Sequence, residues 1–209
     1  MTDEAVEVQR RVLRRLIESL VYEGAVRPEG EPAGGPRDRA RLVGLDSAGD
    51  PVVYSWAARR RFSFDRLRLG AEPVVRAPLG GPPAEACSPR LFLDEIGPRL
   101  EAGTERRSAF AAELERTISN DAQARRHWRA AGRRAAGAAF DDLEALVIDG
   151  HPYHPSYKSR LGFDAADNEA FGPEFARPIR PVWVGLQRDL ARWSAVPGLR
   201  LPLVDDRLL

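Results

Sequence analysis

Hydrophobic residues recur at helical spacing over residues 2–23, and the positions between them are polar or charged. This spacing predicts one amphipathic helix with its apolar side against a core. Thr2 and Asp3 are typical of a helix start, and Gly24 is typical of a helix end. The periodic apolar positions are Val6, Val12, Leu13, Leu16, Ile17, Leu20 and Val21. The arginines that fall between them are predicted to form a solvated face: Arg10, Arg11, Arg14 and Arg15.

After a loop rich in proline and glycine at residues 27–39, the pattern changes to short runs of β-branched and aromatic residues. Residues 41–45 and 51–56 predict a hairpin around the turn at 46–50. A third strand is predicted within residues 60–69 and a fourth within 73–77. Together they predict a small antiparallel sheet packed on the first helix.

A second segment rich in proline and glycine, residues 79–89, is predicted to separate two lobes, residues 1–84 and 85–209. The second lobe is predicted to be mostly helical, and residues 179–190 are predicted to form a strand that contains Trp183. The predicted fold class is therefore α+β, with a motif-bearing loop in the helical lobe. The predicted helices cover residues 90–100, 104–120, 121–139 and 140–148.

Composition narrows the classes of function. A hydrophobic content of 43% with 30% charged residues is ordinary for a globular protein, and the net charge of +1 implies no nucleic-acid or membrane partner. A single cysteine, Cys87, excludes an internal disulfide framework. The sequence shows no leader and no apolar run near 18 residues, so the cytoplasm is the expected location. A solvated helix face is the preferred interpretation of the arginines at positions 125, 126, 129, 133 and 134.

Residues 150–163 gather side chains that are scarce elsewhere in the chain. They include two of the three histidines, His151 and His154, and the only lysine, Lys158. The neighbouring prolines fix φ and favour an extended backbone for the residue before each of them. Ser156 is predicted to begin a short helix, at whose N-terminus Lys158 and Arg160 can reach an anion. A compact ammonium differs in shape and donors from the planar guanidinium, so the lone lysine indicates a specific role.

The pattern Gly-His-Pro-x-His-Pro-x-x-Lys-x-Arg-x-Gly-Phe at residues 150–163, followed by Pro-Glu-Phe at 173–175, resembles the signature of a known family. This is the aerobactin-synthetase-like IucA/IucC family of siderophore synthetases, which work without a peptide-synthetase assembly line. Glu113 to Asn120 resembles an upstream segment of the same family. The resemblance extends over residues 105–188, and the family's members are considerably longer than 209 residues.

The resemblance implies an enzyme that uses ATP and Mg²⁺ to adenylate a carboxylate of citrate or a related polycarboxylic acid. An amine or alcohol substrate then attacks the acyl-adenylate. By motif position, His151, His154, Lys158 and Arg160 would line the pocket where acid and nucleotide meet, and Ser156 would join Lys158 and Arg160 in binding the nucleotide. The resemblance also implies a homodimer and a C-terminal synthetase portion on the same or another chain.

Two alternatives remain at this stage. In the first, His151 and His154 hold a metal with a third ligand, for which the nearby acids are Asp164, Asp167, Glu169 and Glu174. In the second, the chain is a catalytically incomplete or relic binding module, because several downstream motifs of the family do not occur in these 209 residues. A metal assay distinguishes the first alternative from the synthetase hypothesis, and ligand binding distinguishes the second.

Overall fold

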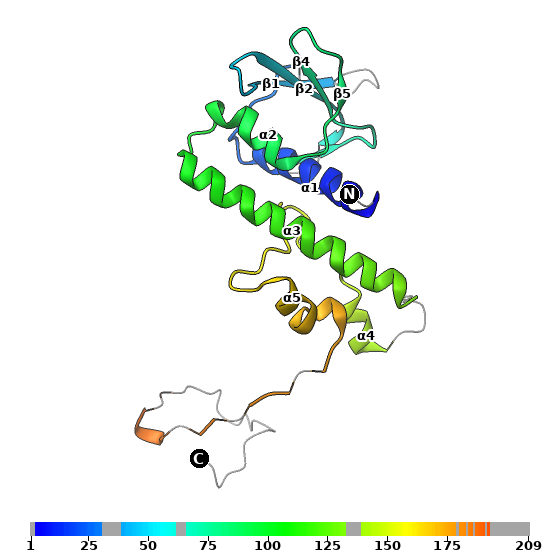
Figure 1. Ribbon diagram of the computed structural model, residues 1–209, viewed down its shortest axis with the longest axis vertical. Coiled ribbons are helices and arrows are strands. Elements are labelled where there is room, and N and C mark those ends of the chain that lie inside the picture. Colours follow the sequence, from blue (N-terminus) through cyan, green and yellow to red (C-terminus); the bar gives the residue numbers. More distant parts are fainter. Residues whose placement is uncertain are drawn as a thin grey trace. The chain divides into compact units, whose positions relative to one another are not determined.

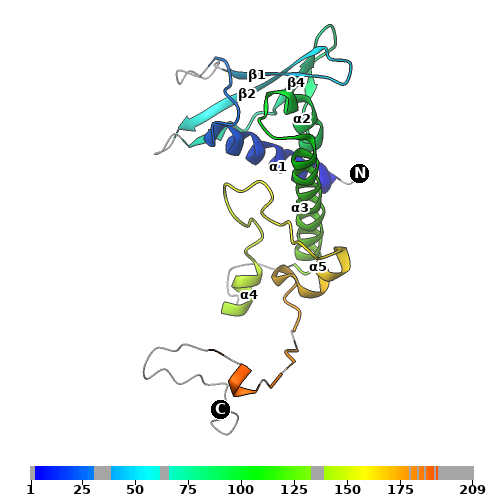
Figure 2. The ribbon, with the colours of Figure 1, turned by 90° about the vertical axis from the view of Figure 1, so that its left-hand side faces the viewer.

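A long helix, α1 (Asp3–Tyr22), lies against a small sheet in the computed structural model of the chain (Figures 1 and 2). The structure describes residues 3–30, 39–61, 66–132, 139–178, 180–182, 184–185, 187–190 and 192. The apolar side of α1 is buried, as its spacing predicts. Its most deeply buried side chains are Val8, Val12, Leu13, Leu16 and Ile17.

The strands are β1 (Arg39–Leu45), β2 (Pro51–Arg61), β3 (Leu67–Leu69), β4 (Val75–Pro78) and β5 (Ala84–Glu85). All pairings are antiparallel, and β2 is the central strand. One edge of β2 pairs with β1, while the other edge pairs with β4 near its start and with β3 near its end. The predicted hairpin and sheet are therefore confirmed. Residues 31–38 of the predicted loop at 27–39 lie outside the described residues. The same holds for residues 62–65 of the predicted third strand at 60–69.

The hairpin turn is built by Asp46, as the Asp-Ser-Ala-Gly-Asp sequence suggests. Its Oδ1 accepts hydrogen bonds from the backbone N atoms of Ala48 and Asp50, both at 2.9 Å. Gly49 supplies a φ of +87°, which most other residues avoid. This turn sets the register that pairs Val43 with Val53.

Two helices complete the main core. Helix α2 (Pro89–Ile96) lies between the sheet and α3 (Thr104–Ala130) in Figure 1 and contacts both. The ring of Phe92 meets the ring of Tyr54 edge to face, with 4.8 Å between centroids. The buried Tyr54 hydroxyl donates to Glu95, and Arg76 Nε donates to the same carboxylate at 2.9 Å. The hydroxyl of Tyr54, the carboxylate of Glu95 and the guanidinium of Arg76 thus satisfy one another in the core, as burial requires.

Helix α3 is continuous, so the prediction of two helices that meet at residues 120 and 121 is wrong. Asn120 and Asp121 suggested a helix start because their side chains often cap helices. Here both side chains are buried and bind groups outside the helix. Asn120 Nδ2 donates to the backbone O of Lys158 at 2.8 Å, and Asp121 accepts from Tyr157 Oη at 2.8 Å. Tertiary partners therefore replace the cap that the local sequence indicates.

The arginines of α1 also differ from the prediction of a solvated face. Arg14 Nη2 donates to the backbone O of Leu69 at 3.0 Å, and Arg11 Nη2 donates to Asp121 at 2.9 Å. Arg15 lies over the ring of Tyr157, with its Cζ 4.2 Å from the centroid. These guanidinium groups bind other elements of the fold instead of facing water alone.

The chain after α3 forms α4 (Phe140–Ala145), α5 (Ala165–Phe171) and two 3₁₀ turns, η3 (Pro173–Phe175) and η4 (Arg188–Leu190). Helix α5 and η3 pack on α3, and α4 contacts η3. No strand occurs among the described residues of 179–190, so that prediction is wrong for them, and Trp183 lies outside the described residues. The predicted α+β class is confirmed.

The chain divides into two compact units, Met1–Arg177 and Pro178–Leu209. The main core of the first unit includes side chains from both sides of residue 84. The predicted division into lobes 1–84 and 85–209 stays a prediction. Within the described residues, no helix combines the length and apolar character that a membrane crossing requires.

Candidate functional site

The motif segment between Gly150 and Phe163 follows an irregular path beside α1 and α3 (Figure 2). Gly150 has a φ of +57°, and Tyr157 packs directly against it. A β-carbon at position 150 would lie 2.7 Å from Cδ2 of Tyr157, so only glycine fits this contact without a shift. The loop thus folds back on itself between these two residues.

The short helix predicted to begin at Ser156 does not form. Residues 156–159 make a turn, in which the backbone N of Ser159 donates to the backbone O of Ser156 at 3.0 Å. Lys158 and Arg160 therefore do not stand at a helix N-terminus, and that part of the reasoning about an anion site is wrong.

The two histidines of the motif are exposed and line one pocket of about 210 Å³. Nδ1 of His151 accepts hydrogen bonds from the backbone N of Tyr153 at 3.3 Å and of His154 at 3.1 Å. Nδ1 of His154 lies 3.2 Å from Oγ of Ser156. The loop itself engages both Nδ1 atoms, so a ligand in the pocket would meet the Nε2 atoms.

The rest of this histidine pocket is lined by the end of α1, by Arg66 and by Leu67 at the start of β3. The Cζ atoms of Arg66 and Arg68 lie 4.4 and 4.7 Å from the ring centroid of Tyr153. Hydrogen bonding to Arg66, and then to Arg68, lowers the pKa of Tyr153 from its ordinary value. The sequence reasoning missed both arginines because they precede the motif by more than eighty positions, beyond the reach of any local pattern.

Lys158 points into the protein. Its Nζ donates to Oε1 of Glu174, and the two side chains are 3% and 5% exposed. Burial acts to raise the pKa of Glu174, but the hydrogen bond and charge of Lys158 outweigh it, so the pKa lies below its ordinary value. The carboxyl group of Glu174 therefore remains charged in the interior.

Arg160 binds the same carboxylate. Its Nη2 lies 2.9 Å from each carboxylate oxygen of Glu174, and its Nη1 donates to Oδ1 of Asn168. The buried Asn168 in turn donates through Nδ2 to Gln123 on α3 at 2.8 Å. These bonds connect the motif to η3, α5 and α3. Glu174 belongs to the Pro-Glu-Phe segment that resembles part of the family signature, and it was also one of the acids considered as a third metal ligand.

Asp121 is the buried acceptor on the other side of the loop. Its Oδ2 accepts from Arg11 Nη2 at 2.9 Å, from Tyr157 Oη at 2.8 Å and from Arg125 Nε at 3.2 Å. Burial raises the pKa of Asp121, although the charge of Arg11 opposes this. Burial likewise raises the pKa of the Tyr157 hydroxyl, with the negative charge of Asp121 adding to the effect. The sequence reasoning missed Asp121 because it took this residue as a helix boundary.

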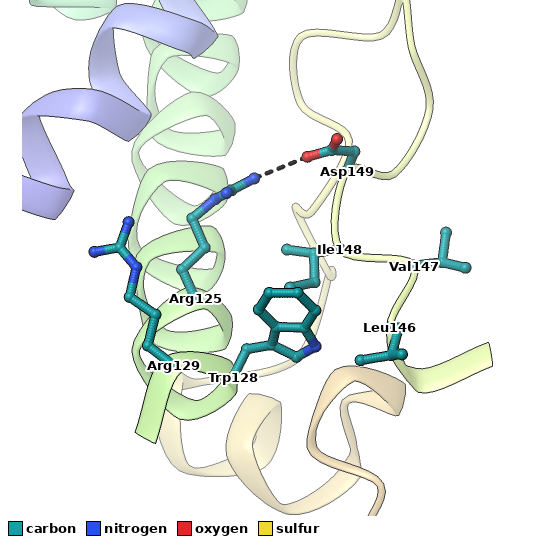
Figure 3. Close-up of a pocket in the computed structure, with 7 residues that line it drawn as sticks. All are labelled: Arg125, Trp128, Arg129, Leu146, Val147, Ile148 and Asp149. Atoms are coloured by element: carbon teal, nitrogen blue, oxygen red, sulfur yellow. Dashed lines mark hydrogen bonds and ion pairs between the residues drawn. The ribbon is translucent and has the colours of Figure 1, made fainter. Parts of the chain in front are cut away.

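A second pocket, of about 480 Å³, lies between α3 and residues 146–149 (Figure 3). The indole of Trp128 and the side chain of Ile148 form its apolar part, while Arg125 reaches across to Asp149 with Nη2 2.8 Å from Oδ1. Its guanidinium groups are committed to carboxylates, since Arg129 also pairs with Glu4 at 3.2 Å. This pocket therefore offers apolar surface more than free charge.

The residues that the sequence predicts thus fall into two groups. His151 and His154 line the histidine pocket, with the buried Ser156 beside His154, whereas Lys158 and Arg160 converge on Glu174. Among the residues that the structure describes, no three side chains of histidine, cysteine, aspartate or glutamate lie together as metal ligands. The geometry gives the His-x-x-His pair no third ligand there.

Comparison with known proteins points to one family. The pattern of the IucA / IucC family matches residues 139–208. A citryl-spermidine/3,4-dihydroxybenzoyl-citryl-spermidine:spermidine ligase of Bacillus anthracis is 34% identical over the whole chain, which covers 32% of that protein. A 2-[(L-alanin-3-ylcarbamoyl)methyl]-3-(2-aminoethylcarbamoyl)-2-hydroxypropanoate synthase of Staphylococcus aureus is 32% identical over 87% of the chain and 28% of its own length. The chain spans about a third of the length of these relatives.

Solved structures agree. The petrobactin biosynthesis protein AsbB of Bacillus anthracis matches with a TM-score of 0.71 and 36% identity, over 85% of this chain and 28% of that one. The aerobactin synthetase IucC of Klebsiella pneumoniae shares the fold, with a TM-score of 0.61 and 21% identity over 82% of this chain and 29% of that one. The motif at residues 150–163, the family pattern over residues 139–208 and these similarities together relate the chain to the IucA / IucC family.

Proposed function

We propose that the chain is the N-terminal part of an ATP-dependent siderophore synthetase. This enzyme adenylates a carboxylate of citrate or a related polycarboxylic acid and condenses it with an amine or alcohol. The observation that carries the proposal is 34% identity, along the whole chain, to a ligase whose name specifies citryl-spermidine and spermidine. The chain covers 32% of that ligase, so the proposal includes a further synthetase portion on the same or another polypeptide. It also includes a homodimer, which the family resemblance implies.

The histidine pocket supports this chemistry. Formation of an acyl-adenylate brings a carboxylate onto a phosphate, so the site must hold two anions together and stabilise the charge that develops. His151 and His154 line a pocket whose other wall carries Arg66. In our proposal the Nε2 atoms of the histidines donate hydrogen bonds to the acid or to phosphate oxygens. Arg66 supplies positive charge beside them.

The roles of Lys158, Arg160 and Ser156 at the nucleotide stay part of the proposal. Glu174 now competes with any anion for Lys158, because the ammonium is buried against this carboxylate. Arg160 has a side chain that is 24% exposed, so it is the cation of this group that a nucleotide can approach more directly. ATP would supply the adenylyl group. Mg²⁺ would arrive on its phosphates, because the described residues offer no cluster of acidic ligands.

Calorimetric titration of the purified chain with ATP and Mg²⁺, with citrate, and with both tests the proposal. Heat of binding that is lost in His151→Ala and in Lys158→Ala is the expected result. Arg90→Ala is the matched control, since Arg90 makes exposed ion pairs with Asp94 and Glu115 away from the loop. Binding unchanged in both motif variants would contradict the assignment of the site.

A second assay addresses the complete reaction. This chain replaces the matching third of the Bacillus anthracis ligase, and ATP consumption that depends on spermidine is measured. The expected result is an active chimaera that His151→Ala inactivates. A folded chimaera without activity would contradict the proposed function and favour a relic module.

A further inference from the structure

The segment that carries both histidines is held at each of its ends by the same polar cluster. Residues 150–156 begin after Asp149 and end before Tyr157. The side chain of Tyr157 donates to Asp121 at 2.8 Å. The side chain of Asp149 accepts from Arg125 Nη2 at 2.8 Å and from Arg11 Nη1. These two arginines also bind Asp121, so one buried carboxylate lies behind both ends of the histidine segment.

Burial distinguishes the two acids of this cluster. The side chain of Asp121 is fully buried, whereas that of Asp149 is 69% exposed. Three donors from α1, α3 and the loop converge on a single oxygen of Asp121. Charge-assisted hydrogen bonds of this kind fix geometry better than an exposed ion pair does. Asp121 is therefore the rigid centre, and Asp149 is its exposed extension.

Arg15 and Gly150 add to the same arrangement. Arg15 Nη1 donates to the backbone O of Asp149 at 2.9 Å while its guanidinium lies over the ring of Tyr157. Tyr157 also packs on Gly150, so the two ends of the segment touch. Because both ends of the segment are fixed, few conformations are open to the residues between them. Those residues include the two imidazoles.

We infer that Asp121 is a positioning residue for the proposed reaction. It acts through Tyr157 and through the arginines that hold Asp149, and it sets the orientation of His151 and His154 at their pocket. This role rests on the proposed function of the histidine pocket, but Asp121 itself is fully buried and does not line that pocket. The same cluster also stabilises the fold, so the test requires a measurement that stability alone does not change.

The chain has three histidines, which makes their imidazoles selective probes. In an NMR spectrum of the chain labelled with ¹⁵N-histidine, His127, His151 and His154 should each give one set of imidazole signals. Asp121→Asn keeps the shape of the side chain and removes its charge, and Tyr157→Phe removes the donated hydrogen bond. In both variants the signals of His151 and His154 should broaden or split into several sets. The signal of His127, which packs 5.0 Å from the ring of Phe175, should remain single and serves as the reference for an intact fold.

Glu72→Gln is the matched control because it changes an exposed acid outside the cluster. Single, unshifted signals of His151 and His154 in folded Asp121→Asn would overturn the inference. If Asp121→Asn does not fold, Tyr157→Phe decides by the same criterion, since loss of one hydroxyl leaves the aromatic packing in place.

A binding measurement separates this inference from the proposed function. In the titrations with citrate and with ATP and Mg²⁺, each single variant should raise the dissociation constant about tenfold. The double variant should raise it no further, because both changes break the same connection. Additive losses would overturn the inference. A native chain that binds neither ligand contradicts the function proposed for the chain, while the histidine signals still decide whether Asp121 positions the loop.

Discussion

Lys158 and Glu174 form an ion pair that is buried almost completely, and it joins the motif loop to η3. Both charged groups have left water, so the loss of Glu174 would leave the ammonium of Lys158 in the interior without its hydrogen-bond partner. Arg160 shares the same carboxylate from the more exposed side. Lys158, the only lysine of the chain, thus lies beside the buried Glu174, to which Arg160 also binds. A compact ammonium fits this shared position beside a guanidinium.

Lys158→Met is expected to lower the free energy of unfolding by about 2 kcal/mol, because Glu174 loses its buried ammonium donor and keeps only Arg160. Urea unfolding followed by circular dichroism measures this change. Arg177→Ala is the control: its ion pair with Glu169 has both side chains about half exposed, so the loss should stay below about 1 kcal/mol. Equal losses in the two variants would show that the buried pair contributes no more than an exposed one.

The pH dependence of stability should report Glu174. Its pKa in the folded state is depressed, so its contribution is present above the unfolded pKa of about 4.3 and is lost as pH falls through the folded pKa. Glu174→Gln should therefore lose less stability than the native chain when the pH falls below about 4.3. The measurement is the free energy of unfolding in urea between neutral and acidic pH. The same acid sensitivity in variant and native chain would contradict this assignment.

Asp121 should affect the pH dependence of stability in the opposite direction to Glu174. Its pKa in the folded state is raised by burial, so its contribution is fully present below the unfolded pKa and is lost as pH rises through the folded pKa. Removing this group in Asp121→Asn should make the loss of stability at acidic pH steeper than in the native chain. The same series of urea titrations measures it, and a shallower slope would contradict the direction of the shift.

Gly150→Ala should destabilise the chain in two ways. Alanine resists a φ of +57° by about 1 to 2 kcal/mol, and its β-carbon would collide with Tyr157. Gly24→Ala is the control for the backbone cost alone, because Gly24 has a φ of +70° but no atom within 4 Å of the added carbon. The difference between the two variants therefore measures the collision with Tyr157. We expect Gly150→Ala to cost at least about 1 kcal/mol more than Gly24→Ala in thermal or urea unfolding. Equal costs would mean that Tyr157 moves aside freely.

Asp164→Ala should weaken the start of α5. Asp164 Oδ1 accepts from the backbone N atoms of Ala166 and Asp167, both at 2.8 Å, and the side chain of Asp167 completes a capping box. Loss of this cap should cost about 1 kcal/mol in urea unfolding. Asp164→Asn, which keeps the capping oxygen, should lose much less. A similar loss in both variants would assign the effect to charge instead of capping.

Local patterns predicted most of the secondary structure. The periodic apolar residues of α1 and the turn sequence that begins at Asp46 act over a few neighbouring positions, and the corresponding elements form as expected. The motif at residues 150–163 likewise pointed to the family, because a run of specified residues can be recognised without any knowledge of its contacts. The sequence by itself therefore determined the fold class, the resemblance to the family and the position of the histidine loop.

Partners that lie far apart in the sequence decided the rest. Asn120 and Asp121 have the side chains of a helix start, yet bonds to Lys158 and Tyr157 hold them inside a continuous α3. Lys158 has the character of an anion ligand, yet Glu174, sixteen positions away, neutralises it. A local pattern records which polar groups are present but not which partner reaches them first. Burial favours partners for most such groups, so only the tertiary structure determines the role of each group.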